Sequence, residues 1–403
     1  MRILWVKVGG LWPLTTGGRL RSYHLVSQLA RRHQVRLITT HGPEDDPDGL
    51  RSSLSHCQDV QSIPFQLPRQ NTARFALALM RSWSSRLPVD MWKARVAALQ
   101  AHVHGVLERG EVDVCVADFL AAASNVPARH RVPIVLFAHN VEHQIWKRLS
   151  AHAGTPWKRA LLEVEWRKMR HYEARACSQA ALTLAVSDID RDLLHSTAPG
   201  ARVRSIPTGV DTEFFRPDEA RERPHHLVFT GAMDWYPNED GILHFLADVL
   251  PAVRAAVPDV TLTLVGRNPT PRLQAAAAAA GARVTGTVDD VRPHVLEGAV
   301  SIVPLRIGGG TRLKIFEALA MGKAVVSTTV GAEGLPLEPR RHFLQADDPA
   351  AFAEAIVGLL RCGQRRRALG RAGRALVEEH YSWTQVSKTF EQRLSEAMVT
   401  HAR

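Results

Sequence analysis

Cysteine is rare in this sequence, and long apolar runs are missing. Only four cysteines occur among the 403 residues, and no two of them form a Cys-x-x-Cys pair. Three of the four have apolar neighbours, so we expect small core residues in a reducing compartment rather than a disulfide framework. Every uncharged apolar stretch falls short of the roughly 18 residues that suggest a membrane-spanning helix. The sequence therefore predicts a folded protein held together by a hydrophobic core.

The first ten residues do not resemble a secretory signal peptide. Lys7 interrupts their apolar run, two glycines end it, and no small-residue cleavage site follows. The run is better explained as a buried first strand, and we expect a cytoplasmic protein. With 45% hydrophobic and 23% charged residues, the composition excludes disorder and collagen-like repeats. At roughly 150 residues per domain, the length favours two domains.

Positive charge is concentrated in the first half of the chain. Residues 1–200 hold 26 Lys and Arg against 17 Asp and Glu, whereas the remainder holds 25 against 23. Residues 69–109 and 147–175 combine this charge with Trp, Leu and Met, which suits an anionic membrane surface or an anionic substrate. Alternatively, these basic segments are only the solvated faces of helices. No recognised nucleic-acid-binding module accompanies the charge, so nucleic acid is not an expected partner.

Short apolar, β-branched runs alternate with helical patterns, which predicts an α/β protein with parallel sheets. Strands are expected at residues 3–8, 35–40, 112–118, 133–138 and 182–186, and in the second half at 227–230, 260–265, 284–287, 300–304 and 324–327. Crossover helices are expected at residues 239–256, 270–280, 289–297, 312–321 and 350–361. Residues 205–217 form the expected linker. Because ligands bind outside the carboxyl ends of parallel strands, a cleft between two such domains is the expected site.

Several common motifs are absent, and two others are misleading. No G-x-G-x-x-G follows a strand, and neither a phosphate-binding P-loop nor a G-x-S-x-G elbow occurs. His139, Glu142 and His143 match the H-x-x-E-H pattern of zinc peptidases, but His139 directly follows a strand and no third ligand is evident. A surface or capping role and a substrate-contacting His139 are the alternatives. Asp188 and Asp190 imitate a metal-binding pair where a helix cap is expected.

Residues 300–328 carry the most informative chemistry. A buried strand leads into Gly308-Gly309-Gly310 and then, through Thr311, into a helix. Glycines let phosphates approach the backbone, and a helix start offers unpaired N–H groups to an anion. The following side chains add donors for a diphosphate and an acceptor for a ribose diol: Arg306, Arg312 and Lys314 as donors, Glu317 as the acceptor. An ordinary glycine-rich loop with solvated arginines is the alternative.

At these residues the chain resembles a known family, the retaining family 4 glycosyltransferases with the two-domain GT-B fold. The block of residues 317–328 is the most specific match. Gly17 and Gly18 resemble the family's N-terminal glycine loop, which sits beneath the donor diphosphate. His139 resembles the histidine that contacts the transferred sugar. Residues 207–217 resemble the crossing into the donor-binding domain, and Ser382-Trp383 resembles the start of the family's last helix.

The resemblance implies a definite domain organisation. Residues 1–207 correspond to an N-terminal, acceptor-binding Rossmann-like domain. Residues 208–380 correspond to a C-terminal, Rossmann-like domain that binds the nucleotide-sugar donor. Residues 381–403 correspond to a C-terminal helix that returns to the N-terminal domain. The two parallel-sheet domains of such a GT-B protein face each other across a cleft.

The sequence departs from the family pattern at two places. The first glutamate of the common Glu-x7-Glu motif is Gly309 here. The Arg and Lys that many members carry after the first strand of the second domain are also missing, and a block that contains Gly231 and Asn238 replaces them. This block and the glycine turn resemble a bacterial branch linked to exopolysaccharide synthesis. We assign Gly231 and Asn238 to donor binding, and we expect Arg306, Arg312 or Lys314 to replace the missing cations.

The resemblance implies transfer of a hexosyl group from a nucleotide-diphospho-sugar to the hydroxyl of a glycan or lipid-linked acceptor. His139, Lys314 and Arg312 are the expected catalytic residues. No cofactor or metal ion is expected, and the enzyme is expected in the cytoplasm with peripheral contact at the inner face of the plasma membrane. A nucleotide-sugar epimerase on the same scaffold and a non-catalytic sugar-nucleotide-binding protein are the alternatives.

Overall fold

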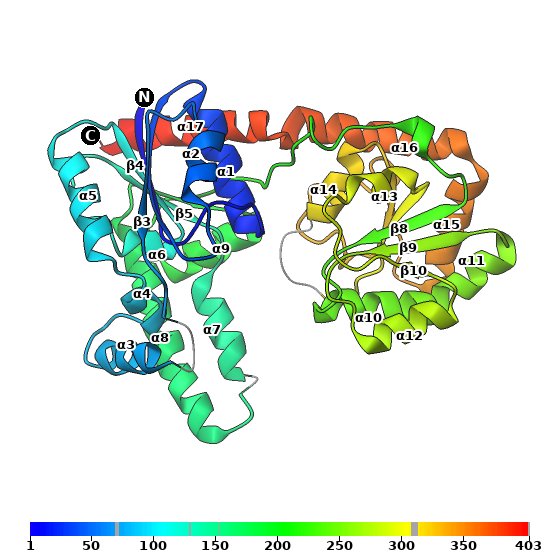
Figure 1. Ribbon diagram of the computed structural model, residues 1–403, viewed down its shortest axis with the longest axis horizontal. Coiled ribbons are helices and arrows are strands. Elements are labelled where there is room, and N and C mark those ends of the chain that lie inside the picture. The colour runs from blue at the N-terminus through cyan, green and yellow to red at the C-terminus, as the bar shows by residue number, and fades with distance from the viewer. Residues whose placement is uncertain (69–71, 129, 152, 308–312, 402–403) are drawn as a thin grey trace. The chain divides into compact units, whose positions relative to one another are not determined.

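The chain divides into two compact units. The structure, a computed structural model, describes residues 1–68, 72–128, 130–151, 153–307 and 313–401. Unit 1 comprises Met1–Pro207 together with Val386–Arg403, and unit 2 comprises Thr208–Gln385. Each unit contains one parallel sheet with helices packed against it (Figure 1). The α/β class with two parallel sheets, expected from the alternating pattern, is therefore confirmed.

The sheet of unit 1 has seven strands in the order β3-β2-β1-β4-β5-β6-β7. Its strands are β1 (Arg2–Lys7), β2 (Gln34–His41), β3 (Asp59–Pro64), β4 (Val114–Asp118), β5 (Ile134–Ala138), β6 (Leu182–Ala185) and β7 (Val203–Ser205). The register pairs Lys7 with Asp118 and Asp118 with Phe137. The carboxyl ends of β1, β4 and β5 therefore lie side by side.

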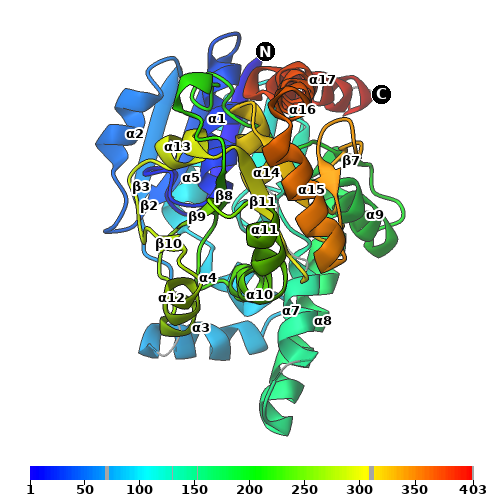
Figure 2. The ribbon, with the colours of Figure 1, turned by 90° about the vertical axis from the view of Figure 1, so that its right-hand side faces the viewer.

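Helices cover both faces of this sheet. They are α1 (Gly17–Ala30), α2 (Pro47–Ser53), α3 (Ala73–Trp83), α4 (Val89–Lys93), α5 (Ala97–Glu108), α6 (Leu120–Ala123), α7 (Glu142–Ala151), α8 (Pro156–Gln179), α9 (Asp188–Thr197) and α17 (Trp383–His401). Phe390 of α17 packs against Trp5 and Phe137, with ring centroids 5.4 and 5.2 Å apart. The side chains of α5, α6 and α8 form a second cluster with Cys115 and Ala117. Figure 2 shows α7 and α8 as a hairpin that extends away from the sheet.

Unit 2 contains a six-stranded parallel sheet in the order β10-β9-β8-β11-β12-β13. Its strands are β8 (His226–Thr230), β9 (Thr261–Val265), β10 (Arg283–Val284), β11 (Val300–Val303), β12 (Ala324–Ser327) and β13 (Leu344–Gln345). Its helices are α10 (Tyr236–His244), α11 (Leu250–Ala256), α12 (Pro271–Ala279), α13 (Arg292–Glu297), α14 (Leu313–Ala320), α15 (Pro349–Arg361) and α16 (Gly363–Leu376), with short turns η1 (Glu219–Arg221), η2 (Phe245–Val249) and η3 (Val377–Tyr381). One continuous apolar core joins these elements.

The expected elements correspond closely to the observed ones, with two differences. Each of the ten expected strands is present, whereas β3, β7 and β13 were not expected. These three are edge strands, so their residues lack the continuous apolar run of a central parallel strand. The single helix expected at residues 239–256 is interrupted: α10 and α11 are separated by the π-helical turn η2. Pro251 explains the break, because it cannot donate a backbone hydrogen bond and its ring crowds the preceding turn.

Candidate active site

In unit 1, three buried polar side chains meet where three neighbouring strands end. Lys7 is the last residue of β1, Asp118 is the last of β4, and His139 directly follows β5. All three are buried. Ligands of open parallel sheets bind at the carboxyl ends of the strands, so this cluster lies at the end of the sheet where a site is expected.

Asp118 is the centre of this cluster. Its carboxylate accepts hydrogen bonds from Trp5 Nε1 at 3.0 Å, Lys7 Nζ at 3.1 Å and His139 Nε2 at 2.7 Å. Burial acts to raise the pKa of Asp118, but Lys7 and His139 outweigh it and hold that pKa well below its usual range. Asp118 is therefore an ionised acceptor that fixes both neighbouring groups.

Both ring nitrogens of His139 have partners. Arg21 Nη1 lies 3.0 Å from His139 Nδ1, and because a guanidinium only donates, Nδ1 accepts. Nε2 then carries the proton that is donated to Asp118. Burial, with Arg21 and Lys7 nearby, lowers the pKa of His139 to about 3 although Asp118 opposes the shift. His139 is therefore a neutral imidazole that links an anion to a buried guanidinium.

The N-terminus of α1 lies against the same cluster. Thr16 caps the helix by accepting from the backbone N–H of Arg19, and Gly17 and Gly18 form its first turn. A Cβ atom on Gly18 would lie 2.7 Å from the ring of Phe119. That ring stacks on the His139 imidazole with a centroid separation of 3.7 Å. The absence of a side chain at Gly18 thus permits close packing of α1 over the His139 cluster.

The sequence pointed to His139, Gly17 and Gly18 but not to Lys7, Asp118 or Arg21. In the sequence, Lys7 stands out only because it interrupts an apolar run. Its position at the end of a buried strand, matched by Asp118 at the end of another, is the signal that identifies both. Arg21 has no comparable signal, because only the fold brings α1 next to His139.

In unit 2, Gly231, Asn238 and Lys314 are in contact after the end of β8. Lys314 Nζ donates to Asn238 Oδ1 at 2.9 Å, and Asn238 Nδ2 donates to the carbonyl of Ala232 at 2.8 Å. A Cβ on Gly231 would lie 2.7 Å from Lys314 Nζ. The ammonium also lies 4.1 Å from the centroid of the Phe229 ring. The structure therefore brings together three of the residues assigned from the sequence to donor binding or catalysis.

Arg306 and Glu317 differ in their surroundings. Arg306 forms a two-pronged ion pair with Asp240 of α10, with nitrogen–oxygen distances of 2.7 and 3.0 Å. Glu317 lies half-buried on α14, one turn after Lys314. Burial raises the pKa of Glu317 to about 7, although the Lys314 charge acts in the opposite direction. Glu317 thus changes its charge near neutral pH. The remaining assigned residues, Gly308, Gly309, Gly310, Thr311 and Arg312, lie outside the described residues.

Known proteins resemble both halves of the chain. Residues 16–214 match the model of Glycosyltransferase Family 4, and residues 224–362 match that of Glycosyl transferases group 1. The MMP alpha-(1->4)-mannosyltransferase of Mycolicibacterium hassiacum is 26% identical over 388 residues, or 90% of each chain. The phosphatidyl-myo-inositol mannosyltransferase of Mycobacterium leprae is 30% identical over 232 residues, or 54% of this chain and 59% of that one. This chain belongs to the family 4 glycosyltransferases.

The fold of this glycosyltransferase agrees with its family. Anabaena HepE, solved in complex with UDP, superposes with a TM-score of 0.66 at 14% identity, covering 98% of this chain and 100% of that one. The two parallel sheets therefore form a GT-B architecture, as the resemblance in the sequence implied.

The two motifs that imitate metal sites have other partners in this glycosyltransferase. His143 Nδ1 lies 2.5 Å from Glu173 Oε2, whereas His139 pairs with Asp118. Ser187 caps α9 by accepting from the backbone N–H of Asp190, so the expected helix cap is confirmed. Among the described residues, no group of three or more His, Cys, Asp or Glu is arranged to hold a metal ion. In the same part of the chain, no helix is both long and apolar enough to cross a membrane.

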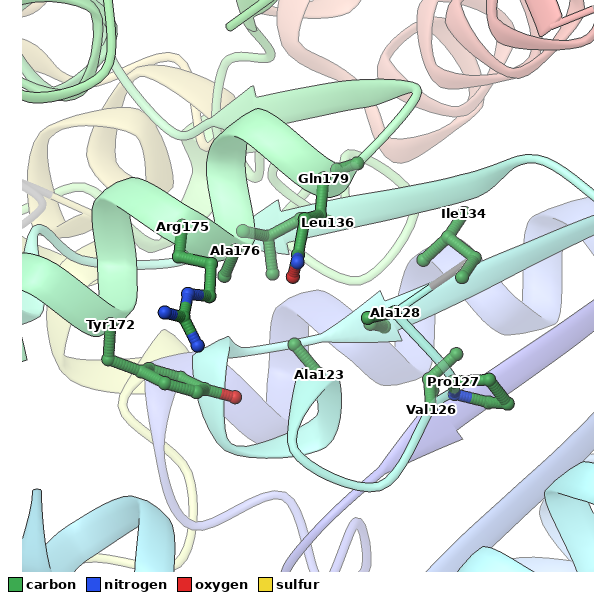
Figure 3. Close-up of a pocket in the computed structure, with 12 residues that line it drawn as sticks. Ala123, Val126, Pro127, Ala128, Ile134, Leu136, Tyr172, Arg175, Ala176 and Gln179 are labelled. Atoms are coloured by element: carbon green, nitrogen blue, oxygen red, sulfur yellow. The ribbon is translucent and has the colours of Figure 1, made fainter. Parts of the chain in front are cut away.

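A small cavity of about 50 Å³ lies between α6, α8 and the strands β4 and β5 of the glycosyltransferase (Figure 3). Apolar residues such as Ala123 and Leu136 form much of its lining, and Tyr172, Arg175 and Gln179 of α8 supply its polar groups. None of the His139 cluster lines it. Its volume suits a few water molecules and is far below the roughly 300 Å³ of the smallest ligand pockets.

Proposed function

We propose that this glycosyltransferase transfers a hexosyl group from a nucleoside-diphospho-sugar to an acceptor hydroxyl with retention of the anomeric configuration, without a metal ion. The observation that carries the proposal is the contact of Lys314 with Gly231 and Asn238 at the end of β8. Asn238 holds the ammonium, and the absence of a side chain at Gly231 lets the ammonium lie close to the backbone after β8.

Lys314 has the charge that the leaving group requires. As the glycosidic bond breaks, negative charge grows on the nucleoside diphosphate, and a fixed ammonium stabilises that charge in the transition state. We propose that Gly308, Gly309, Gly310, Thr311 and Arg312, which precede α14 in the sequence, add backbone and guanidinium donors. Glu317 accepts from the donor ribose. Arg306, held by Asp240, has a secondary role at the rim of this site.

We propose that His139 acts on the sugar through Arg21. Since both imidazole nitrogens have partners, the imidazole is a positioning residue, and the Arg21 guanidinium is the group it orients. Two buried cations, Lys7 and Arg21, surround one carboxylate, Asp118, so the cluster favours an anionic or strongly hydrogen-bonding ligand. The donor's own phosphate takes the acceptor proton on the same face, and no protein general base is required.

The proposed acceptor is a lipid-linked or polysaccharide-precursor hydroxyl in bacterial exopolysaccharide or cell-surface glycan synthesis. The similarity to a phosphatidyl-myo-inositol mannosyltransferase supports a lipid-linked acceptor. The scarce, widely spaced cysteines and the basic first half support a cytoplasmic enzyme with peripheral contact at the inner face of the plasma membrane. Mannose-type donors are the first to test, because the two relatives described above are mannosyltransferases.

Substitution of Lys314 tests the proposed donor site. Lys314→Ala should weaken donor binding and lower kcat, each by about tenfold or more, because charge-assisted contacts of this kind contribute roughly 1.5–3 kcal/mol. Donor affinity is measured by titration with GDP-mannose and UDP-glucose, and turnover with lipid-linked acceptors. Arg365→Ala, an exposed change on α16, is the matched control. Wild-type affinity and turnover in Lys314→Ala would refute the assignment.

The same assays test the reaction itself. Proton NMR of the product should show the donor's anomeric configuration, and exhaustive chelation should leave the rate nearly unchanged. An isomerised donor in place of a glycosylated product would instead identify an epimerase. Donor binding without transfer to any acceptor would identify a non-catalytic binding protein. Loss of activity on chelation, with rescue by zinc, would contradict the metal-free mechanism.

A further inference from the structure

One end of unit 1 exposes large apolar side chains on three neighbouring helices. On α3, Met80 and Trp83 are 61% and 55% exposed, and Leu77 is exposed on the same side. On the α7–α8 hairpin, Trp157 is 71% exposed, and Leu149 is exposed near the turn. Of the fourteen exposed large hydrophobic side chains among the described residues, seven belong to these three helices. Soluble surfaces rarely gather apolar groups in this way without a partner.

Hydrogen bonds attach α3 and the following helix α4 to α8, the second helix of the hairpin. Lys168 Nζ of α8 donates to the carbonyl of Ser82 at 2.8 Å, and Glu165 of α8 accepts from the backbone N–H of Val89 at 2.7 Å. These bonds hold α3 and α4 against α8. Figures 1 and 2 both show α3 beside the hairpin at the same end of unit 1. We call the surface made by Leu77, Met80, Trp83, Leu149 and Trp157 the hairpin face.

The charges around the hairpin face have one sign. Lys147 and Arg148 at the end of α7, and Lys158 and Arg159 at the start of α8, are exposed on either side of the turn. The glutamates of these two helices are buried or half-buried and have partners. Glu142 accepts from Asn140, Glu163 pairs with Arg167, Glu165 pairs with Lys168, and Glu173 pairs with His143. Every exposed Asp, Glu, Lys or Arg in the described parts of α7 and α8 is therefore basic.

We propose that the hairpin face docks on an anionic lipid bilayer. Tryptophan and leucine side chains suit the boundary between headgroups and acyl chains, and long basic side chains reach the headgroup phosphates from the same helices. A nucleic acid would match the charge but leave the exposed apolar groups in water. This inference rests on the proposed peripheral membrane contact and deepens it by assigning the contact to one surface of unit 1. It concerns neither the donor nor the transfer step.

Vesicle binding tests this inference without donor or acceptor. The full chain is sedimented with phosphatidylcholine vesicles and with vesicles of about one third phosphatidylglycerol, at about 0.05 and 0.5 M salt. Binding should require the anionic lipid and should weaken with salt. Tryptophan fluorescence should shift to shorter wavelength on binding, because Trp83 and Trp157 leave water.

Matched variants separate the contribution of the basic side chains to vesicle binding from that of the apolar side chains. Lys158→Glu with Arg159→Glu should lower the partition coefficient at least tenfold at low salt, and Met80→Ser with Trp157→Ser should lower it at both salt concentrations. The controls are Arg365→Glu with Arg367→Glu on α16, and Ile189→Ser with Val399→Ser on exposed positions of unit 1. Thermal unfolding checks that each variant is folded. Equally weak binding to both vesicle types would overturn the proposal, and so would an equal loss of vesicle binding in the control variants. Neither result would affect transfer to a soluble acceptor, which tests the proposed reaction separately.

Discussion

Glu317 and His139 are two titratable residues whose surroundings shift their pKa values in opposite directions. Burial raises the pKa of the Glu317 carboxyl to about 7, whereas it lowers the pKa of the His139 imidazole to about 3. In both cases burial disfavours the charged form. Each shift predicts a pH dependence that can be measured separately, one in donor binding and the other in stability.

Donor affinity should increase as the pH rises through about 7. Above that pH Glu317 is a carboxylate and accepts two ribose hydrogen bonds, whereas below it one oxygen carries a proton. Titrations with the donor at pH values from about 6 to 8 measure the change. Glu317→Gln should remove this dependence, and Glu317→Ala should weaken binding by roughly ten- to a hundred-fold. An unchanged profile in Glu317→Gln would exclude this carboxyl as the titrating group.

The free energy of unfolding should decrease as the pH falls below about 6.5. Between that value, typical of an unfolded histidine, and about 3, the native His139 binds fewer protons than the unfolded chain. The depressed pKa of Asp118 adds a loss in the same direction below about pH 4. Each such proton changes stability by at most about 1.4 kcal/mol per pH unit.

Denaturant unfolding at several pH values measures this dependence. His139→Gln retains a donor and an acceptor but does not titrate, so its stability should change less steeply between about pH 6.5 and 4. His102→Gln, at an exposed position of α5, is the matched control. Equal slopes in the wild type and in His139→Gln would show that the imidazole is not held neutral.

At the scale of secondary structure, the packing of α1 on the His139 cluster depends on Gly18. Gly18→Ala places a methyl group against the Phe119 ring, where an ideal Cβ lies 2.7 Å from the ring atom Cζ. We expect a loss of about 1–3 kcal/mol in unfolding free energy, typical of an overpacked site. Phe119→Leu removes the obstructing atom and should recover part of this loss in the double variant. Gly200→Ala, where no heavy atom lies within 4 Å of the added Cβ, is the control. Additive losses in the double variant would contradict the contact.

The sequence predicted central elements better than edges. Nine of the ten expected strands are central, and central parallel strands are apolar on both faces. The tenth, β10, is an edge strand and overlaps its expected range only at Val284. Edge strands such as Asp59–Pro64 are only half-buried, so their composition does not distinguish them from loops. The break at Pro251 was predictable in principle, since proline interrupts helices.

For the whole molecule, the two-sheet architecture followed from the alternation of strands and helices, and the family followed from motifs near Glu317 and His139. The network of side-chain contacts around His139 did not follow from the sequence. Asp118 and Arg21 are about one hundred residues apart in the sequence, and only strand order and helix packing bring them to the same imidazole. The hairpin face was foreseen as a basic, Trp-containing region, but which charges are exposed depends on the burial of its glutamates.

The packing of α17 has a consequence for the synthesis of the protein. Phe390 is fully buried against Trp5 and Phe137, yet the residues of unit 2 are translated before it. On the ribosome, the nascent first unit therefore exposes the aromatic surface that Phe390 later covers. Domains that precede others in the chain often fold first during translation. Here the earlier unit cannot complete its core until the later one has emerged, and a fragment ending at Pro207 would lack that contact permanently.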